Sequence, residues 1–512
     1  MRRKMICLAL ALCMAFAMLP VMGGAADIVE SGACGDNATW TLDSDGTLTI
    51  SGTGDMTTEP WYISADQIKR IVIEDGVTNI SQNAFYGLSS VTSAEIPSSV
   101  TSIGKNAFRG CSSLTSVTIP ASAAVIGSGA FYECSGLRSL TISPGVESIG
   151  EEAFRCCESL THADIPDSVT IIGDGAFRDC SSLKSARIPS GVTNIADRLF
   201  YGCGSLGSAE IPSGVTTIGD CAFEVCYSLT SVSIPSSVTS IGNNAFQGCE
   251  SLGSVTIPES VTSIGKNAFK SCSSLKTVTI PGNVMTINEG TFKSCSGLTS
   301  VTIPESVTVI GKDAFYGCKS LLIVNIPSGV VSIGDSAFKN CSSLAAVTIA
   351  QGVTSIEHDA FLDCSSLTTV TIPASVTSIR YWAFGRCDSL SDVYYGGSEA
   401  QWDKISIESS NDRLKSADIR YDSSPPTFRA DPQKGELIAV DKTGAALAVS
   451  GDVSASSPVF ATVYDASGKM ISADVMNAPD SVDVTGGSTA KLIWLDSDGF
   501  TAKSECMEFE ID

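Results

Sequence analysis

The chain has 512 residues, which is too long for one ordinary hydrophobic core, so several domains or an array of repeats are expected. It carries 32 basic and 55 acidic residues, for a formal net charge of −23. Because nucleic acids and anionic membrane surfaces are bound through basic patches, this balance argues against both as partners.

The first residues are typical of an export signal. Arg2, Arg3 and Lys4 precede an apolar run over 6–22, and small residues at 23–26 suit cleavage before residue 27. No second apolar stretch of about 20 residues follows, so no membrane span is expected in the mature chain. We interpret 1–26 as a signal peptide and expect a secreted, extracellular protein, with association to the cell surface left open.

Residues 27–77 are predicted to form an N-terminal cap. Within 38–50, apolar residues alternate on both sides of the turn sequence Asp43-Ser44-Asp45-Gly46, as in a β-hairpin. The start of a calcium loop also looks like this, but the distal Glu is missing here, which favours the turn. Trp61 and an expected strand over 68–73 lead into the next segment.

A 23-residue unit recurs through residues 78–400. Fourteen phenylalanines, from Phe85 to Phe384, follow one another at this period. An isoleucine precedes each by five residues, and a cysteine follows by three residues in every copy but the first, which has Leu88. The unit reads V-T-x-I-G-x-x-A-F-x-x-C-x-x-L-x-x-V-x-I-P-x-x.

This spacing predicts stacked β-strands. In L-x-x-V-x-I the Val and Ile point to one face of a short strand, which Pro ends. Phe and Cys at i and i+3 are expected to share one face of a single helical turn. Burial of the apolar side chains of one unit contributes roughly 10–15 kcal/mol, whereas ordering its backbone costs at least about 20 kcal/mol of conformational entropy. Parallel stacking of equivalent units must therefore stabilise the array.

The repeat decays towards its C-terminal end, where Arg380 replaces the turn Gly and Tyr395 the strand Ile. Residues 401–421, with Trp402, are predicted to form a C-terminal cap, and 422–427 a linker. From 428 to 512 the sequence pattern changes to short runs in which apolar and polar residues alternate, and these runs predict a small Ig-like β-sandwich. These runs lie at residues 436–440, 446–449, 459–464, 470–475, 482–484, 492–495 and 507–511.

The repeat, the Trp40 and Asp-Gly entry segment and the Tyr394-Tyr395-Gly396 exit resemble the BspA-type bacterial leucine-rich-repeat family, over about residues 30–421. The predicted fold is mostly β: a parallel-stranded leucine-rich-repeat solenoid of fourteen 23-residue turns with capping segments, then the sandwich. The resemblance implies a secreted or surface protein that often serves as an adhesin for host matrix proteins and cell surfaces. It transfers no individual site residue.

Catalytic chemistry has little support in the sequence. The two histidines, His162 and His358, would lie about eight turns or roughly 40 Å apart, too far to share a metal or a proton. No G-x-S-x-G, phosphate loop or H-E-x-x-H occurs. We expect no enzyme, no cofactor and no metal.

The nineteen cysteines allow two interpretations. Many cysteines in a secreted chain usually pair as disulfides. Thirteen of these, from Cys111 to Cys387, fall in one inward column, where their Cβ atoms would point the same way, which favours buried free thiols. Cys156 and Cys221 stand outside the column. Whether any cysteines pair is left open.

Two functions remain. In the first, the solenoid is an adhesin-like surface that contacts host or matrix proteins or glycans. In the second, it is a spacer that holds the β-sandwich away from the cell envelope. A bland row of threonines between the inward Val and Ile favours the spacer, whereas the position after each Phe is rich in Tyr and Arg, which dominate binding hot spots. The predicted ligand-contact stripe consists of Tyr86, Arg109, Tyr132, Arg155, Arg178 and Tyr201.

The stripe has a simpler explanation as well. Glu151 precedes Arg155 by four residues, and Asp174 precedes Arg178 by four. An alternative interpretation of these arginines is therefore that they form local surface ion pairs, each worth roughly a few tenths of a kcal/mol. The pairs Glu289 with Lys293 and Asp335 with Lys339 repeat the arrangement. Arg109 has Lys105 at that position instead, so its charge is predicted to lack a local partner.

Overall fold

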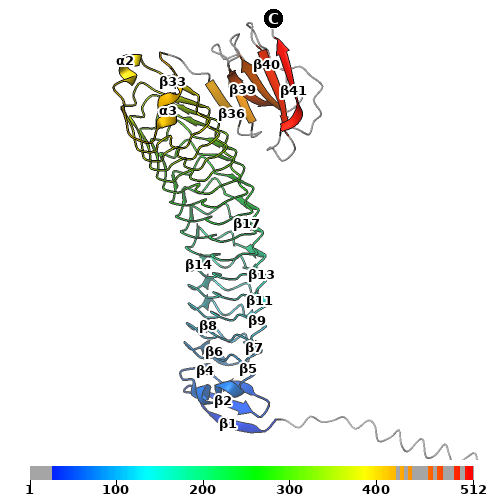
Figure 1. The fold of residues 1–512 in the computed structure, drawn as a ribbon. Coiled ribbons are helices and arrows are strands. Elements are labelled where there is room, and N and C mark those ends of the chain that lie inside the picture. Colours follow the sequence, from blue (N-terminus) through cyan, green and yellow to red (C-terminus); the bar gives the residue numbers. More distant parts are fainter. Residues whose placement is uncertain are drawn as a thin grey trace, which may run out of the picture.

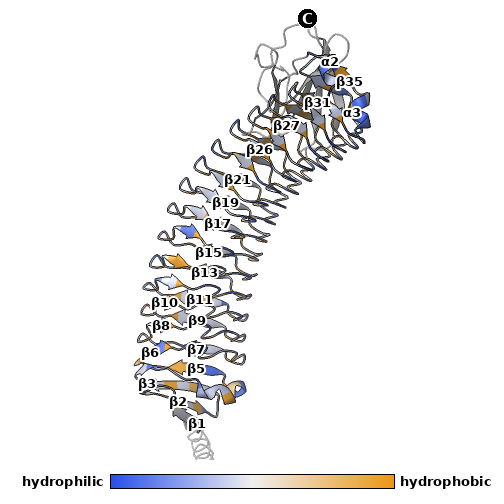
Figure 2. Ribbon diagram, turned by 90° about the vertical axis from the view of Figure 1, so that its left-hand side faces the viewer, coloured by the Kyte–Doolittle hydropathy of each residue, from blue (hydrophilic) through white to orange (hydrophobic). Residues whose placement is uncertain are grey.

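Two rows of short parallel strands run along a curved rod (Figures 1 and 2) in the computed structural model, which describes residues 26–422 and six strands between 427 and 510. Each repeat supplies one strand to each row, and equivalent residues 23 apart pair, as Thr118 does with Thr141. Within a strand, Val117 and Ile119 are buried and Thr118 is exposed. The alternation predicted from the L-x-x-V-x-I segment is confirmed.

The strands of the first row are β3 (Thr47–Gly52), β5 (Arg70–Ile73), β7 (Ser93–Glu95), β9 (Ser116–Ile119), β11 (Ser139–Ile142), β13 (His162–Asp164), β15 (Ser185–Arg187), β17 (Ser208–Glu210), β19 (Ser231–Ser233), β21 (Ser254–Thr256), β23 (Thr277–Thr279), β25 (Ser300–Thr302), β27 (Ile323–Ile326), β29 (Ala346–Ile349), β31 (Thr369–Ile372), β33 (Asp392–Tyr395) and β35 (Asp418–Arg420). The strands of the second row are β4 (Gly54–Asp55), β6 (Val77–Ile80), β8 (Ser102–Ile103), β10 (Val125–Ile126), β12 (Ser148–Ile149), β14 (Ile171–Ile172), β16 (Asn194–Ile195), β18 (Thr217–Ile218), β20 (Ser240–Ile241), β22 (Ser263–Ile264), β24 (Thr286–Ile287), β26 (Val309–Ile310), β28 (Ser332–Ile333), β30 (Ser355–Ile356), β32 (Ser378–Ile379) and β34 (Ser406–Ile407).

The parallel stacking continues past the fourteen repeats at both ends. Leu48 of β3 pairs with Ile71 of β5, and Val393 of β33 pairs with Ile419 of β35. In the described part of the chain the second row holds sixteen strands, so the solenoid has about sixteen turns and not fourteen. The cap segments themselves thus form the first and last turns, because their apolar residues keep the inward spacing of the repeat.

The segment around each phenylalanine is not the predicted helical turn. It consists of tight turns with two left-handed residues per repeat, such as Asn106 (φ 53°) and Gly110 (φ 77°) around Phe108. These conformations direct alternate N–H groups towards the next repeat, and the N–H of Phe85 donates to the carbonyl of Ala107 at 2.7 Å. A third ladder of backbone hydrogen bonds between repeats therefore alternates with bonds inside the segment, such as that from the N–H of Cys111 to the carbonyl of Phe108 at 3.2 Å.

The phenylalanines form one continuous column through the rod. Neighbouring ring centroids are 4.9–6.0 Å apart from Phe85 to Phe384, and every ring is at most 1% exposed. Trp61 extends the column at the N-terminal end, with its ring 5.7 Å from that of Phe85. The stacking of equivalent units that the 23-residue period predicts is confirmed in the core.

Different elements close the two ends. At the N-terminal end, β1 (Ile28–Ala33), β2 (Ala38–Asp43) and β3 are antiparallel, so the predicted hairpin is present, and the 3₁₀ helix η1 (Pro60–Gln67) carries Trp61. At the other end, α2 (Glu399–Trp402) and α3 (Asp412–Ser416) flank β34.

Beyond the solenoid, β36 (Thr427–Asp431) and β37 (Glu436–Val440) pair antiparallel. The strands β38 (Val459–Tyr464), β39 (Met470–Met476), β40 (Thr489–Leu495) and β41 (Ala502–Glu510) form an antiparallel sheet in the order β39-β38-β40-β41. The expected strands at 446–449 and 482–484, residues 423–426 of the linker and residues 1–25 of the signal peptide lie outside the described residues. The Ig-like sandwich stays a prediction.

Candidate functional site

The six residues of the predicted stripe lie in successive turns, each directly after a buried phenylalanine. Tyr86, in the first repeat, is 44% exposed, whereas the side chains of Arg109, Arg155 and Arg178 are 30%, 23% and 27% exposed. The two other tyrosines are half-buried. The stripe is therefore a packed edge of the rod and not a row of free side chains.

Tyrosine rings and guanidinium groups lie against one another along this edge. The guanidinium carbon of Arg109 is 4.2 Å from the ring centroid of Tyr132 and 5.8 Å from that of Tyr86. The guanidinium carbon of Arg155, in the following repeat, is 4.9 Å from the centroid of the same Tyr132 ring. That of Arg178 is 4.8 Å from the ring centroid of Tyr201. Such contacts attract the cation to the ring and restrict both side chains.

Carboxylates from the same turn and from the next one neutralise the arginines. Asp179 lies 3.7 Å from Nε of Arg155 and 3.2 Å from Nε of Arg178, which joins the two cations. Burial lowers the pKa of Arg155, but the hydrogen bond to Glu152 and its charge raise it above the usual value. The edge thus presents aromatic rings and paired charges together, with no large net charge.

The predicted pairs between residues four apart are wrong, although Arg155 has a local partner in Glu152, three residues before it, at 2.6 Å. Lys293 pairs with Asp313 at 2.8 Å and Lys339 with Asp359 at 2.9 Å, each partner lying in the next repeat. Arg109, expected to lack a partner, has Glu133 of the next turn 3.7 Å from its Nε. The reason is that equivalent residues in adjacent turns are stacked, whereas positions four apart do not face each other outside a helix.

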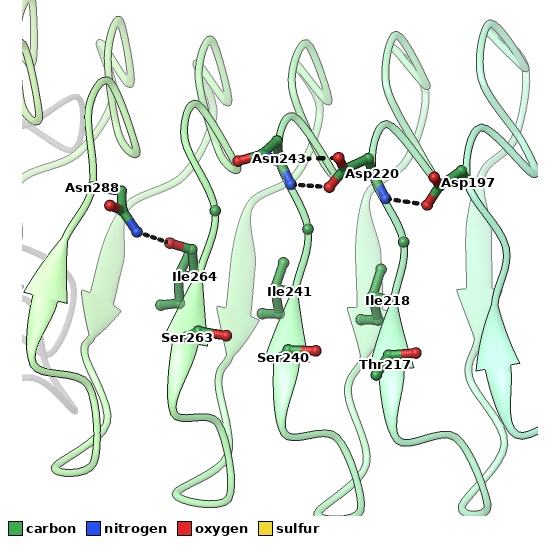
Figure 3. A pocket seen from close by; sticks show the side chains of 13 residues that line it. Asp197, Thr217, Ile218, Asp220, Ser240, Ile241, Asn243, Ser263, Ile264 and Asn288 are labelled. Carbon is green, nitrogen blue, oxygen red and sulfur yellow. Dashed lines mark hydrogen bonds between the residues drawn. The ribbon is translucent and has the colours of Figure 1, made fainter.

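A second surface feature lies on the strands β18, β20 and β22, where a hollow of about 430 Å³ is lined by small polar side chains (Figure 3). Here the N–H of Asp220 donates to Oδ1 of Asp197 at 2.8 Å, and the N–H of Asn243 donates to Oδ1 of Asp220 at 2.6 Å. The sequence signal was the run of Asp and Asn three residues before Phe in adjacent repeats. These side chains satisfy the turn backbone, so the hollow is explained by the fold.

The cysteine column offers no reactive thiolate. Each of its thirteen Sγ atoms donates a hydrogen bond to a phenylalanine carbonyl of the preceding repeat, at 3.1–3.3 Å, as Cys111 does to Phe85. Burial raises the pKa of Cys111 and of Cys295 to about 12. Cys156 and Cys221 are half-buried, and burial raises their pKa values too, that of Cys221 to about 11. Protonated, buried sulfur behaves as a small apolar group.

Other chemistry is sparse in the described ranges. His162 and His358 are exposed, as predicted. Within residues 26–422 and the six later strands, no three His, Cys, Asp or Glu side chains gather so as to hold a metal ion. No helix in that part of the chain is both long and apolar enough to cross a bilayer.

Comparison with known proteins identifies relatives of the repeat array. The model of the BspA-type leucine-rich-repeat region matches residues 61–184, 170–299 and 285–411. The structure of a leucine-rich-repeat protein from Bacteroides ovatus is 27% identical, with a TM-score of 0.56, over 75% of this chain and 98% of that one. A leucine-rich cell surface protein from Faecalibacterium prausnitzii is 31% identical over 75% of this chain and 100% of its own, with a TM-score of 0.40. No curated protein sequence matches this chain significantly.

Proposed function

This chain belongs to the BspA-type leucine-rich-repeat family, and on that basis we propose that it is a secreted or surface-displayed binding protein with an adhesin-like role. Its solenoid contacts an extracellular protein or glycan, and the stripe from Tyr86 to Tyr201 is the contact edge. The related protein from Faecalibacterium prausnitzii is described as a cell surface protein, which supports the location.

The observation that carries this proposal is the unbroken row of Tyr and Arg along one edge. These residue types contribute most to binding hot spots, and here six of them follow one another without a break. Because Arg109 is held between the rings of Tyr86 and Tyr132, little conformational freedom is left to lose when a partner binds. The edge is therefore organised before binding.

A spacer role is the second candidate, and the row of threonines between the inward Val and Ile, such as Thr118 and Thr141, favours it. A second row of threonines lies directly before the strands β18 and β20. Threonine hydroxyls donate to the backbone of the preceding turn, as Oγ1 of Thr216 does to the carbonyl of Thr193 and Oγ1 of Thr239 to that of Thr216, both at 3.2 Å. Their hydrogen-bonding capacity serves the rod and not a ligand. This surface is uniform over several turns. A spacer tolerates such a uniform surface, whereas a specific binder needs side chains that differ along the rod.

A fourfold variant tests the contact edge: Tyr86, Arg109, Tyr132 and Tyr201 are all changed to Ser. The rod should stay folded, because the four cation–π contacts that are removed are worth about 0.5–1 kcal/mol each, a loss of about 2–4 kcal/mol in all. Adhesion of the full chain to cells and immobilised matrix proteins should be lost. The matched control changes Lys270, Lys293, Tyr316 and Lys339 on the same edge of later turns and should keep adhesion.

The spacer role predicts a different sensitivity. Removal of three whole repeats, residues 238–306, joins equivalent positions and leaves the stripe intact. A binder should keep its adhesion in this shortened chain, whereas a spacer should lose function with length. Full adhesion by the fourfold variant, with its fold intact, would refute the contact edge.

A further inference from the structure

One residue breaks the pattern of the left-handed positions. Two residues before every phenylalanine of the column, the backbone has a φ of 52–63°. Thirteen repeats place a residue other than an aromatic there, most often Asn or Gly, which tolerate this conformation. The last repeat has Trp382, with a φ of 58°. A bulky residue held in this region is unfavourable and marks a place where the side chain has a use.

A second exception accompanies the first. The position after phenylalanine carries a side chain in thirteen repeats, but in the last it is Gly385. The backbone at 385 has no positive φ that would require glycine, and a Cβ atom there would overlap Cε3 of Trp382. Leu362 occupies the equivalent position in the preceding repeat, and its Cδ1 would lie 3.0 Å from a Cβ atom at residue 385. Glycine therefore leaves room for the indole ring to lie over the backbone.

The indole forms one wall of a pocket of about 480 Å³, within the range of small-ligand sites. From the last repeat the lining also includes Arg386 and Asp388, and the rest comes from the segment at Ser410 and from α3 of the C-terminal cap, which Figure 1 shows at the end of the rod. The cap residues that line it are Ser410, Asp412, Arg413 and Ser416.

The two arginines of this pocket are accessible and each is in an ion pair, Arg386 with Asp363 and Arg413 with Asp388. The guanidinium carbon of Arg386 lies 5.7 Å from the ring centroid of Trp382. Nε of Arg413 lies 3.7 Å from Oδ1 of Asp388, and their side chains are 57% and 70% exposed. Two arginines and two aspartates line the pocket, so their charges cancel. A strongly charged ligand would gain little net attraction here.

We propose that this pocket binds a neutral glycan, with the face of one pyranose ring packed on Trp382 and its hydroxyls bonded to the arginine, aspartate and serine side chains. A sugar ring offers an apolar C–H face to an aromatic ring and hydroxyls that both donate and accept. Guanidinium groups only donate and carboxylates only accept, so a set containing both matches adjacent hydroxyls. The site is separate from the stripe and does not depend on it.

A purely structural role for Trp382 fits the geometry less well. The N–H of Phe384 donates to Oδ1 of Asn411 at 2.8 Å, and Asn411 and Leu414 of the cap are fully buried, so other residues close the end of the column. Trp382 is only half-buried. A lid would be expected to bury the ring.

The substitution Trp382→Asn separates the two roles. Asn occupies the same position in four other repeats, so the melting temperature should stay the same or rise. Calorimetric titration of the full chain would use maltohexaose, cellohexaose, mannohexaose and N-acetylchitohexaose. At least one should bind to the wild type, and the variant should bind it at least about tenfold more weakly, a difference of about 1.4 kcal/mol.

A second substitution tests the part of Gly385. Gly385→Ala should displace the indole and weaken glycan binding in the wild-type background, yet it should leave the melting temperature of the Trp382→Asn variant unchanged. The fourfold stripe variant is the control and should bind the glycan normally. The proposal is overturned if no oligosaccharide of the four binds, if Trp382→Asn binds as the wild type does, or if a heparin hexasaccharide is preferred to all four.

Discussion

Alkaline pH is expected to destabilise the solenoid, because the thiols of its central column must stay protonated while it is folded. In the unfolded chain a thiol titrates near pH 9.0, whereas burial raises the pKa of Cys111 and Cys295 to about 12 and shifts the other column thiols in the same direction. Above pH 9 the unfolded chain thus releases protons that the folded chain retains. Stability is therefore fully present below pH 9 and falls as the pH rises from about 9 to about 12.

The magnitude follows from the number of thiols. Each loses about 0.4 kcal/mol of stabilisation at pH 9 and about 1.4 kcal/mol at pH 10. For twelve of the thirteen that donate to phenylalanine carbonyls, leaving out Cys341, whose pKa is not shifted as far, this sums to about 5 kcal/mol at pH 9 and about 17 kcal/mol at pH 10. Since a typical domain is stable by only about 5–15 kcal/mol, the rod should unfold, or fray from its ends, near pH 10.

The assay is urea unfolding followed by circular dichroism, between pH 7 and pH 10, with a reductant present. A variant with Cys249, Cys272 and Cys295 changed to Ala should be less stable at pH 7, but its loss between pH 7 and pH 10 should be smaller by about 4 kcal/mol.

The matched control truncates buried groups that do not titrate, with Val255, Val278 and Val301 changed to Ala. It should lower stability at neutral pH without altering the pH dependence. Equal pH dependence in the cysteine variant and the wild type would refute the reasoning, and so would a wild type that is equally stable at pH 7 and pH 10.

Three further outcomes are expected. Phe246→Ala should cost about 3–5 kcal/mol in urea unfolding, because the ring is fully buried between two others at 5.3 Å; a near-neutral result would contradict the column. Val225→Gly should raise the melting temperature, since Val225 has a φ of 63° where several other repeats have Gly, and a decrease would show that its side chain packs usefully. Thiol counting on freshly purified, denatured protein should recover at least about ten column thiols, whereas peptide mapping of consecutive disulfides would exclude the free-thiol column.

Much of the solenoid follows from the sequence because its period is visible there. A repeat of 23 residues with Ile, Phe, Cys, Leu, Val and Ile at fixed places can bury those residues only if equivalent turns stack. The continuous column from Phe85 to Phe384 and the inward cysteines follow from this alone. The hairpin at Asp43–Gly46 was predictable too, because alternation and turn residues are local signals.

The tertiary structure decided what depends on neighbours in the stack. Phe85 donates its N–H to the next turn and not along its own segment, so the i and i+3 spacing that indicated a helix had another cause. Lys293 pairs with Asp313 and not with Glu289, because residues about 20 apart in sequence face each other across adjacent turns. The pocket at Trp382 needed the cap folded against the last repeat. Sequence spacing specifies which side chains point inward, but only the stacked turns determine which outward side chains meet.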